Sequence, residues 1–124
     1  MSKTVMVVDD EPDIVLMVRL ILELDGYDVL EASTGEDALE VLDRETPNAL
    51  LLDIRLPGLD GWGVLDRLKR DSRLEETPVI MVSAHATPST SARALREGCR
   101  AYLTKPFDSE QLLGIVKSVV PSDN

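Results

Sequence analysis

The chain has 124 residues, a length that fits one domain with a single core and leaves no room for a second unit of similar size. Its hydrophobic content of 44% excludes a disordered chain, and its apolar runs are too short for the roughly 18 residues of a membrane helix. The formal net charge of −10 opposes direct binding of nucleic acid, whose phosphates carry the same sign.

The cysteine content and the first residues indicate where the chain functions. Cys99 is the only cysteine, so an internal disulfide is excluded, and one histidine leaves no Cys/His set for zinc. Met1-Ser2-Lys3 leads directly into a strand-like run rather than into a signal peptide. We therefore expect a cytoplasmic protein that has no association with membranes.

The first part of the chain predicts two strands, each followed by a helix. The apolar run 4–8 precedes a helix that begins near Pro12, where a first-turn proline is tolerated, and ends at Gly26. The run 27–30 mixes acidic with apolar residues, as a strand at the edge of a sheet does. The segment 33–36 (Ser-Thr-Gly-Glu) then predicts a capping box for the second helix.

The rest of the chain continues the same alternation. The remaining predicted elements are strands at 49–52, 78–82 and 101–103, and helices that begin near Asp60, at Thr87-Pro88 and near Asp108. Strict alternation predicts a parallel sheet with right-handed crossovers and helices on both faces. The predicted fold class is α/β, a doubly wound sandwich.

The fourth predicted helix, which ends at Gly98, differs from the others in composition. Between residues 87 and 97 it consists mostly of Ser, Thr, Ala and Arg, and only Ala92, Ala94 and Leu95 offer apolar contacts. Because it buries little apolar surface, we expect it to be the least firmly anchored helix. A solvated surface helix and a movable element both remain open as interpretations.

Chemically active side chains follow the predicted strands. Asp9-Asp10 follows the first strand, Asp53 the third, Ser83 the fourth and Lys105 the fifth. The carboxyl ends of parallel strands lie along one edge of a sheet, and ligands bind there at the point where the strand order reverses. We therefore expect three carboxylates, one hydroxyl and one ammonium to converge.

The charge of this group predicts a cation. Three aspartates and one lysine leave −2, and like charges in proximity are unfavourable unless one is protonated or a cation binds. An all-oxygen ligand set suits Mg²⁺ and disfavours zinc or copper.

The alternative interpretation of these residues is three separate helix caps with a solvated lysine. It fits Asp9 or Asp10 ahead of Pro12, but it does not fit Asp53, which a loop follows.

Four segments together resemble the receiver domain of a two-component response regulator. They occur in order over essentially the whole chain: Val7-Val8-Asp9-Asp10-Glu11-Pro12, the segment from Leu51 to Gly61, Val82-Ser83-Ala84, and Tyr102-Leu103-Thr104-Lys105-Pro106-Phe107. The resemblance implies a flavodoxin-like sandwich of five parallel strands in the order 2-1-3-4-5 with five helices. It also implies a receiver domain at 1–120 and a short C-terminal tail at 121–124.

The resemblance implies a phosphorylation-controlled signalling switch rather than an enzyme. Asp53 would accept a phosphoryl group from a sensor histidine kinase or a histidine phosphotransfer protein. Asp10 and Asp53 would ligate Mg²⁺ directly, Asp9 directly or through water, and the backbone carbonyl of Arg55 would complete the protein ligands. Slow autodephosphorylation would be the only further chemistry of the chain.

The remaining implied roles concern the phosphoryl group and the response to it. Lys105 and Ser83 would each bind a phosphoryl oxygen, and the Lys105-Pro106 bond would be cis. Ser83 and Tyr102 would form the switch that changes the affinity for an output protein or effector domain outside this chain. Without the resemblance, Tyr102 is simply a half-buried strand tyrosine. Arg55 and His85 would modulate the rate of dephosphorylation, although His85 is equally compatible with an ordinary exposed loop position.

Three other functions fit the sequence less well than the switch does. A Mg²⁺-dependent phosphohydrolase with an aspartyl nucleophile normally has Asp-x-Asp after one strand, whereas adjacent Asp9-Asp10 follow the first strand here. A receiver-like module that works without phosphorylation would have lost an acidic, hydroxyl or lysine position, and none is lost. A flavin-binding protein of the same topology needs an anion-binding loop where Asp9-Asp10-Glu11 would repel an anion.

Overall fold

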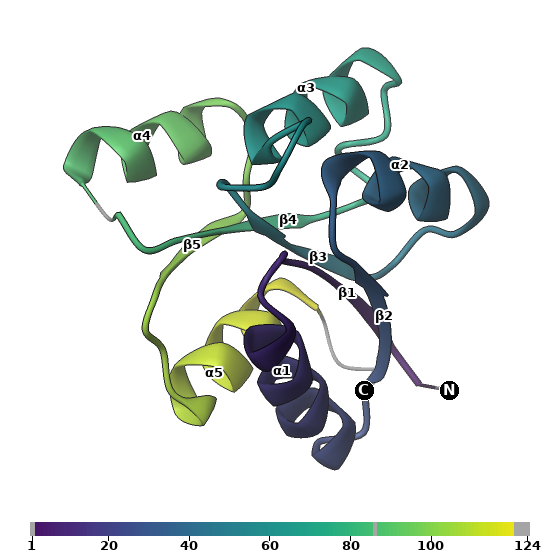
Figure 1. Cartoon of the computed structure of the whole chain (residues 1–124), viewed down its shortest axis with the longest axis vertical. Coiled ribbons are helices and arrows are strands. Elements are labelled where there is room, and N and C mark those ends of the chain that lie inside the picture. Colours follow the sequence, from purple (N-terminus) through teal and green to yellow (C-terminus); the bar gives the residue numbers. More distant parts are fainter. Residues whose placement is uncertain (1, 86, 121–124) are drawn as a thin grey trace.

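Five strands alternate with five helices in the computed structural model, which describes residues 2–85 and 87–120 (Figure 1). The strands are β1 (Thr4–Val8), β2 (Asp28–Ala32), β3 (Ala49–Asp53), β4 (Val79–Ser83) and β5 (Ala101–Thr104). The helices are α1 (Pro12–Leu24), α2 (Gly35–Arg44), α3 (Gly61–Arg70), α4 (Pro88–Arg96) and α5 (Ser109–Val119). The predicted tail at 121–124 lies outside the described residues.

All strand pairs are parallel, and the sheet has the order β2-β1-β3-β4-β5. Helices α1 and α5 cover one face of the sheet, and α2, α3 and α4 cover the other (Figure 1). This arrangement confirms the doubly wound α/β fold, including the predicted edge position of β2. No helix among the described residues is long and apolar enough to span a membrane.

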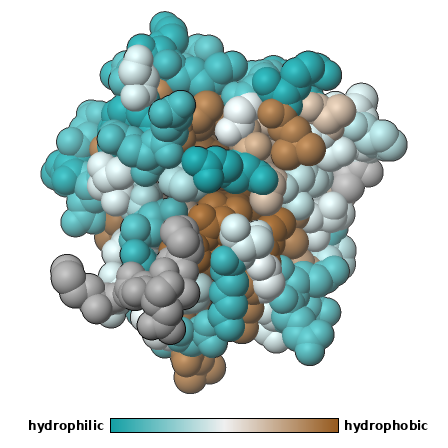
Figure 2. All heavy atoms as spheres, turned by 180° about the vertical axis from the view of Figure 1, so that it is seen from behind, coloured by the Kyte–Doolittle hydropathy of each residue, from teal (hydrophilic) through white to brown (hydrophobic). Residues whose placement is uncertain are grey.

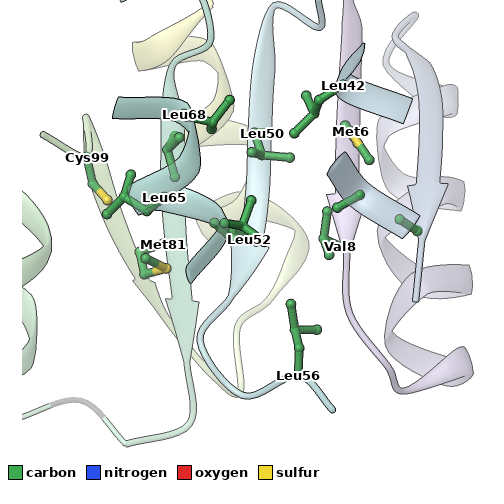
Figure 3. Close-up of a cluster of buried hydrophobic side chains, with 14 of the residues drawn as sticks. Met6, Val8, Leu42, Leu50, Leu52, Leu56, Leu65, Leu68, Met81 and Cys99 are labelled. Atoms are coloured by element: carbon green, nitrogen blue, oxygen red, sulfur yellow. The ribbon is translucent and has the colours of Figure 1, made fainter. Parts of the chain in front are cut away.

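The strands carry apolar side chains toward both layers of helices. Met6 and Val8 of β1 belong to the cluster beneath α2 and α3, whereas Val5 and Val7 belong to the cluster beneath α1 and α5. Figure 3 shows the first cluster, in which Leu65 of α3 lies among side chains from the central strands. Burial on both faces holds the ends of β1, β3 and β4 in place, and the predicted site residues lie at these ends. On the surface opposite the view of Figure 1, hydrophilic residues gather on the left and at the top of the view, and apolar residues show near its centre (Figure 2).

The second strand differs from its prediction in both bounds. The predicted run began at Tyr27, but the strand extends from Asp28 to Ala32. The backbone N–H of Tyr27 donates to the carbonyl of Leu22 at 3.0 Å and so closes the end of α1. Pairing with β1 begins one residue later and continues as far as Val8.

The capping box predicted for the second helix is wrong, although the helix is capped. The Thr34 side chain accepts a hydrogen bond from the backbone N–H of Asp37. The Glu36 carboxylate instead accepts from the backbone N–H of Leu59 at 3.3 Å, in the loop before α3. A complete capping box occurs at α5, between Asp108 and Gln111.

Helix α4 buries even less than its sequence predicts. Ala94 is its only fully buried residue, and Leu95 is 55% exposed. Ala92 is exposed as well, so two of the three predicted apolar contacts are wrong. The cause is the position of α4 over the last strands of the sheet, where one small side chain faces the core.

Candidate phosphoacceptor site

Asp9 and Asp53 lie next to each other because of the sheet topology. β1 pairs with β3, and Val8 is opposite Leu52, so the residues that follow this pair emerge at the same edge. The strand order reverses at this point, because β2 lies on the other side of β1. An opening at the carboxyl ends of the strands is the expected ligand site in such a sheet.

Lys105 reaches these two aspartates from the far side of β4. Its Nζ lies 2.7 Å from Oδ2 of Asp9, 2.7 Å from Oδ2 of Asp53 and 3.4 Å from Oε1 of Glu11. Its backbone N–H donates to the carbonyl of Ser83 at 2.9 Å, which fixes the start of the side chain beside β4. The Lys105–Pro106 bond is cis, as the resemblance implied.

Burial and hydrogen-bonded ion pairing shift the pKa values of Asp53 and Lys105 in opposite directions. Asp9 and Asp53 are only 3% and 5% exposed. Burial raises the pKa of Asp53, against the hydrogen bonds that it accepts from Lys105 and from the backbone N–H of Arg55. Burial lowers the pKa of Lys105, but the hydrogen bonds to Asp53 and Asp9 outweigh burial and leave the pKa raised. Lys105 therefore carries its positive charge at neutral pH.

The site holds more negative charge than Lys105 balances. Carboxylate oxygens of Asp9, Asp10, Glu11 and Asp53 lie within 4.8 Å of one another. Four carboxylates and one ammonium leave a local charge of −3, and the donors are all oxygen, so the residues fit a Mg²⁺ ion. Glu11 was not predicted as part of this cluster. Its position directly after Asp9-Asp10 was the available signal.

Ser83 and Tyr102 bond to the same residue of the loop between β4 and α4. The Ser83 Oγ accepts from the backbone N–H of His85 at 3.0 Å, and the Tyr102 hydroxyl donates to the His85 carbonyl at 3.4 Å. Tyr102 is half-buried against the cluster beneath α2 and α3. The backbone of His85 therefore connects the two predicted switch residues.

The exposure of the other predicted residues is consistent with their place around an opening. Arg55, Ala84 and His85 are exposed, and so is Asp10, whereas Ser83 is buried.

The alternative capping role of Asp9 or Asp10 at α1 is absent, because Glu11 is the N-cap and no side chain caps it. Asp9 instead accepts the backbone N–H of Glu11 at 2.9 Å.

Comparisons with known proteins agree on one family. A family model described as the response regulator receiver domain matches residues 5–117. The chain is 40% identical over 118 residues to protein PilG of Pseudomonas aeruginosa, covering 95% of this chain and 87% of that protein. It is 37% identical over 119 residues to the phosphate regulon transcriptional regulatory protein PhoB of the same organism, covering 96% and 52%. The chain spans about half the length of the first curated relatives that it matches.

Solved structures show the same fold. The chemotaxis response regulator CheY4 of Vibrio cholerae aligns with a TM-score of 0.89 and 27% identity, over 96% of this chain and 99% of that chain. The receiver domain of the Francisella response regulator 1452 aligns with a TM-score of 0.90 and 29% identity, over 96% and 97%.

Proposed function

This chain belongs to the response regulator receiver domain family, and we propose that residues 1–120 form a phosphorylation-controlled switch whose phosphoacceptor is Asp53. The observation that carries the proposal is the position of the Asp53 carboxylate, buried at the carboxyl edge of the sheet and 2.7 Å from the Lys105 ammonium. The chain takes up one phosphoryl group and then changes its affinity for another protein, without turnover of a substrate.

The phosphoryl donor is a phosphohistidine of a sensor histidine kinase or a histidine phosphotransfer protein. An oxygen of Asp53 attacks phosphorus, the new P–O bond forms as the P–N bond to the histidine breaks, and the imidazole leaves. An ionised carboxylate is already a nucleophile, so the main requirements are alignment and relief of charge repulsion. The Arg55 N–H, 2.9 Å from Oδ1 of Asp53, orients the carboxylate.

The groups around Asp53 hold the transferred oxygens. Lys105 moves its ammonium from the carboxylate to a phosphoryl oxygen, and the Ser83 hydroxyl donates to another. Asp10, Asp53 and Asp9, with the backbone carbonyl of Arg55, would bind Mg²⁺, which when present neutralises charge on the phosphoryl oxygens. The four clustered carboxylates support this assignment.

The response to phosphorylation follows from the bonds to His85. When the Ser83 hydroxyl turns toward the phosphoryl group, the backbone N–H of His85 loses its acceptor. The loop then shifts, and the carbonyl that Tyr102 bonds shifts with it. Tyr102 turns further into the space beneath α4, the helix with the fewest buried residues, and the altered surface binds the output protein or effector domain. The chain itself does not bind nucleic acid.

Arg55 and His85 flank the opening to Asp53 and set the lifetime of the phosphorylated state. Both are exposed beside the buried acceptor, where their side chains shield or guide an attacking water. Substitution of either residue changes the rate of dephosphorylation without preventing phosphorylation.

The test of this function is phosphorylation by a small-molecule phosphate donor with Mg²⁺, followed by intact mass. The wild-type chain gains one phosphoryl group, and Asp53→Asn gains none. Asp60→Asn is the matched control, because Asp60 is an exposed aspartate that caps α3, and this variant is labelled normally. Labelling of Asp53→Asn contradicts the assignment of Asp53, and turnover of a small phosphoester favours a hydrolase.

A further inference from the structure

A second polar site lies beside the phosphoacceptor site, between α3 and α4. It is a cleft of about 430 Å³, and these two helices lie side by side over the same face of the sheet (Figure 1). Three arginines line it, Arg55, Arg93 and Arg96, together with His85 and with Ser83, which the cleft shares with the phosphoacceptor site. Among the residues that the structure describes, no carboxylate lines it. Such a concentration of positive groups stands out in a chain with a net charge of −10.

Arg93 is held in place from two sides. Its guanidinium lies over the Trp62 ring, 3.9 Å from the centroid, and its Nε donates to the Glu97 carboxylate at 2.6 Å. A cation above an aromatic face is attracted by the electrons of the ring, so Trp62 stabilises this position. Because the guanidinium has further N–H donors on its terminal nitrogens, a fixed Arg93 is a prepared donor for an anion.

The positive charges of this region share very little counter-charge. Glu97, the carboxylate that pairs with Arg93, also lies 3.9 Å from Lys69. The hydrogen bond from Arg93 lowers the pKa of Glu97, and the charges of Lys69 and Arg96 lower it further. The single negative charge of Glu97 therefore faces three positive side chains. Arg55, across the cleft, forms no ion pair within the described part of the chain. An anion in the cleft therefore relieves repulsion between arginines.

The first turn of α4 adds neutral donors to the same cleft. Ser89 and Thr90 line it, and Thr87, the N-cap, bonds to both of their hydroxyls. The N-terminal end of a helix carries partial positive charge, which attracts anions. The arginines, these hydroxyls and the helix end thus all favour a negatively charged ligand.

From this geometry we propose that the cleft between α3 and α4 binds a small compound with two or more linked phosphate groups. The volume is in the range of small-molecule sites, and arginine guanidinium groups match phosphate oxygens in pairs. A phosphate chain is favoured over an acidic protein segment because Arg93 covers the aromatic ring that would otherwise anchor a protein partner. Inorganic oligophosphate and the phosphate tail of a nucleotide share this chemistry.

Fluorescence of Trp62, the only tryptophan, reports the site directly. In Mg²⁺-free buffer, titration with tripolyphosphate or with ATP changes the emission and saturates, and calorimetry gives the same affinities. Arg96→Gln weakens binding of both ligands about tenfold, the effect of one lost charge-assisted hydrogen bond. Equal affinities identify the phosphate chain as the ligand, whereas ATP binding tenfold more tightly identifies a nucleotide. Both outcomes support the proposal.

Two variants distinguish binding in this cleft from binding at the phosphoacceptor site and from attraction by overall charge. Arg44→Gln removes one exposed positive charge at the end of α2, away from the cleft. The proposal expects this variant to bind both ligands as tightly as the wild type, whereas attraction by overall charge alone would weaken binding. Lys105→Gln, measured on protein whose folded state is verified by circular dichroism, also leaves the affinity unchanged, because the ligand does not contact the Lys105 ammonium. The proposal is overturned if Lys105→Gln abolishes binding while Arg96→Gln does not, if Arg44→Gln weakens binding as much as Arg96→Gln, or if only an acidic peptide saturates the signal.

Discussion

Lys105 lies within 3.4 Å of three carboxylates, and two of them, on Asp9 and Asp53, are almost fully buried. Surface ion pairs contribute little to stability, since water screens both charges in the folded and unfolded chain. A buried charge that loses its partner has no such screening, so its removal from water remains uncompensated. Lys105 therefore matters to the folded state as well as to the proposed phosphoryl transfer.

Replacing Lys105 by Met should lower the free energy of unfolding by about 3 kcal/mol at pH 7 without Mg²⁺, because two buried carboxylates then face each other. Urea denaturation measures this loss. Adding Asp53→Asn to Lys105→Met should restore part of the stability, since one of the two charges is removed. Lys117→Met is the control: its ammonium pairs with Asp25 at 3.3 Å on the exposed surface, and the expected loss is below about 0.5 kcal/mol. Equal losses in the two single variants would mean that burial of the carboxylates adds nothing to the effect of Lys105.

Two glycines provide a second comparison at the residue scale. A Cβ on Gly61 would lie 2.4 Å from the carbonyl oxygen of Asp53 and 2.8 Å from the Cα of Ile54. Both atoms belong to the backbone, so this Cβ would displace the chain that holds Asp53, the proposed phosphoacceptor. A Cβ on Gly114, inside α5, meets nothing within 4 Å.

Gly61→Ala should therefore destabilise the chain by about 1–3 kcal/mol and slow phosphorylation of Asp53. Gly114→Ala should stabilise it by about 0.5–1 kcal/mol, because alanine loses less backbone entropy in a helix. Thermal unfolding and the labelling rate check both variants. Normal labelling and stability in Gly61→Ala would show that the backbone at Asp53 tolerates displacement.

The convergence of Asp9, Asp53 and Lys105 could be predicted from the sequence because strand ends of a parallel sheet share one edge. That rule acts on backbone positions and needs no knowledge of side-chain direction. The inclusion of Glu11 depends on where its own exposed side chain lies, and the cleft of Arg93 depends on how α4 rests beside Trp62. Neither of these is fixed by strand or helix periodicity.

At the scale of elements, α4 and α5 differ in what holds them to the sheet. α5 buries Leu112, Val116 and Val119 and has a complete capping box, whereas α4 buries only Ala94. A helix with little buried apolar surface opens locally without unfolding the domain. The cap of α4 should therefore influence local opening, and the cap of α5 should influence global stability.

Thr87→Ala removes the side chain that accepts the backbone N–H of Thr90 at 3.2 Å. Loss of an N-cap is worth about 1 kcal/mol, so hydrogen exchange within α4 should accelerate about fivefold while the urea midpoint changes little. Asp108→Ala at α5 should instead lower the midpoint of the whole domain. If Thr87→Ala shifts the midpoint as much as Asp108→Ala, α4 unfolds only with the rest of the chain.

Element boundaries show where local sequence rules reach their limit. The segment 33–36 contains the correct residues for a capping box, yet Glu36 bonds to Leu59, which lies 23 positions away. The loop before α3 provides a free backbone N–H beside Glu36, and this tertiary contact replaces the local one. The predicted start of the second strand failed for a different, local reason, because the backbone N–H of Tyr27 completes the end of α1 by bonding to Leu22.

For the whole molecule, the net charge of −10 is the dominant electrostatic property. Self-repulsion at this charge destabilises the compact state, and salt reduces it by screening. The cluster of Asp9, Asp10, Glu11 and Asp53 concentrates part of this charge within 4.8 Å. General screening and specific binding of a divalent ion thus both stabilise the chain, and they must be separated.

Mg²⁺ should raise the melting temperature more than NaCl at equal ionic strength. A ligand at about ten times its dissociation constant stabilises the folded state by about 1.4 kcal/mol, which corresponds to roughly 5 °C for a domain of this size. Asp10→Asn removes one exposed carboxylate of the cluster and should reduce the Mg²⁺ shift while the NaCl shift remains. Differential scanning calorimetry of both proteins in both salts makes the comparison. Equal shifts with the two salts would mean that the carboxylates act only as general surface charge and that no Mg²⁺ site exists at the edge of the sheet.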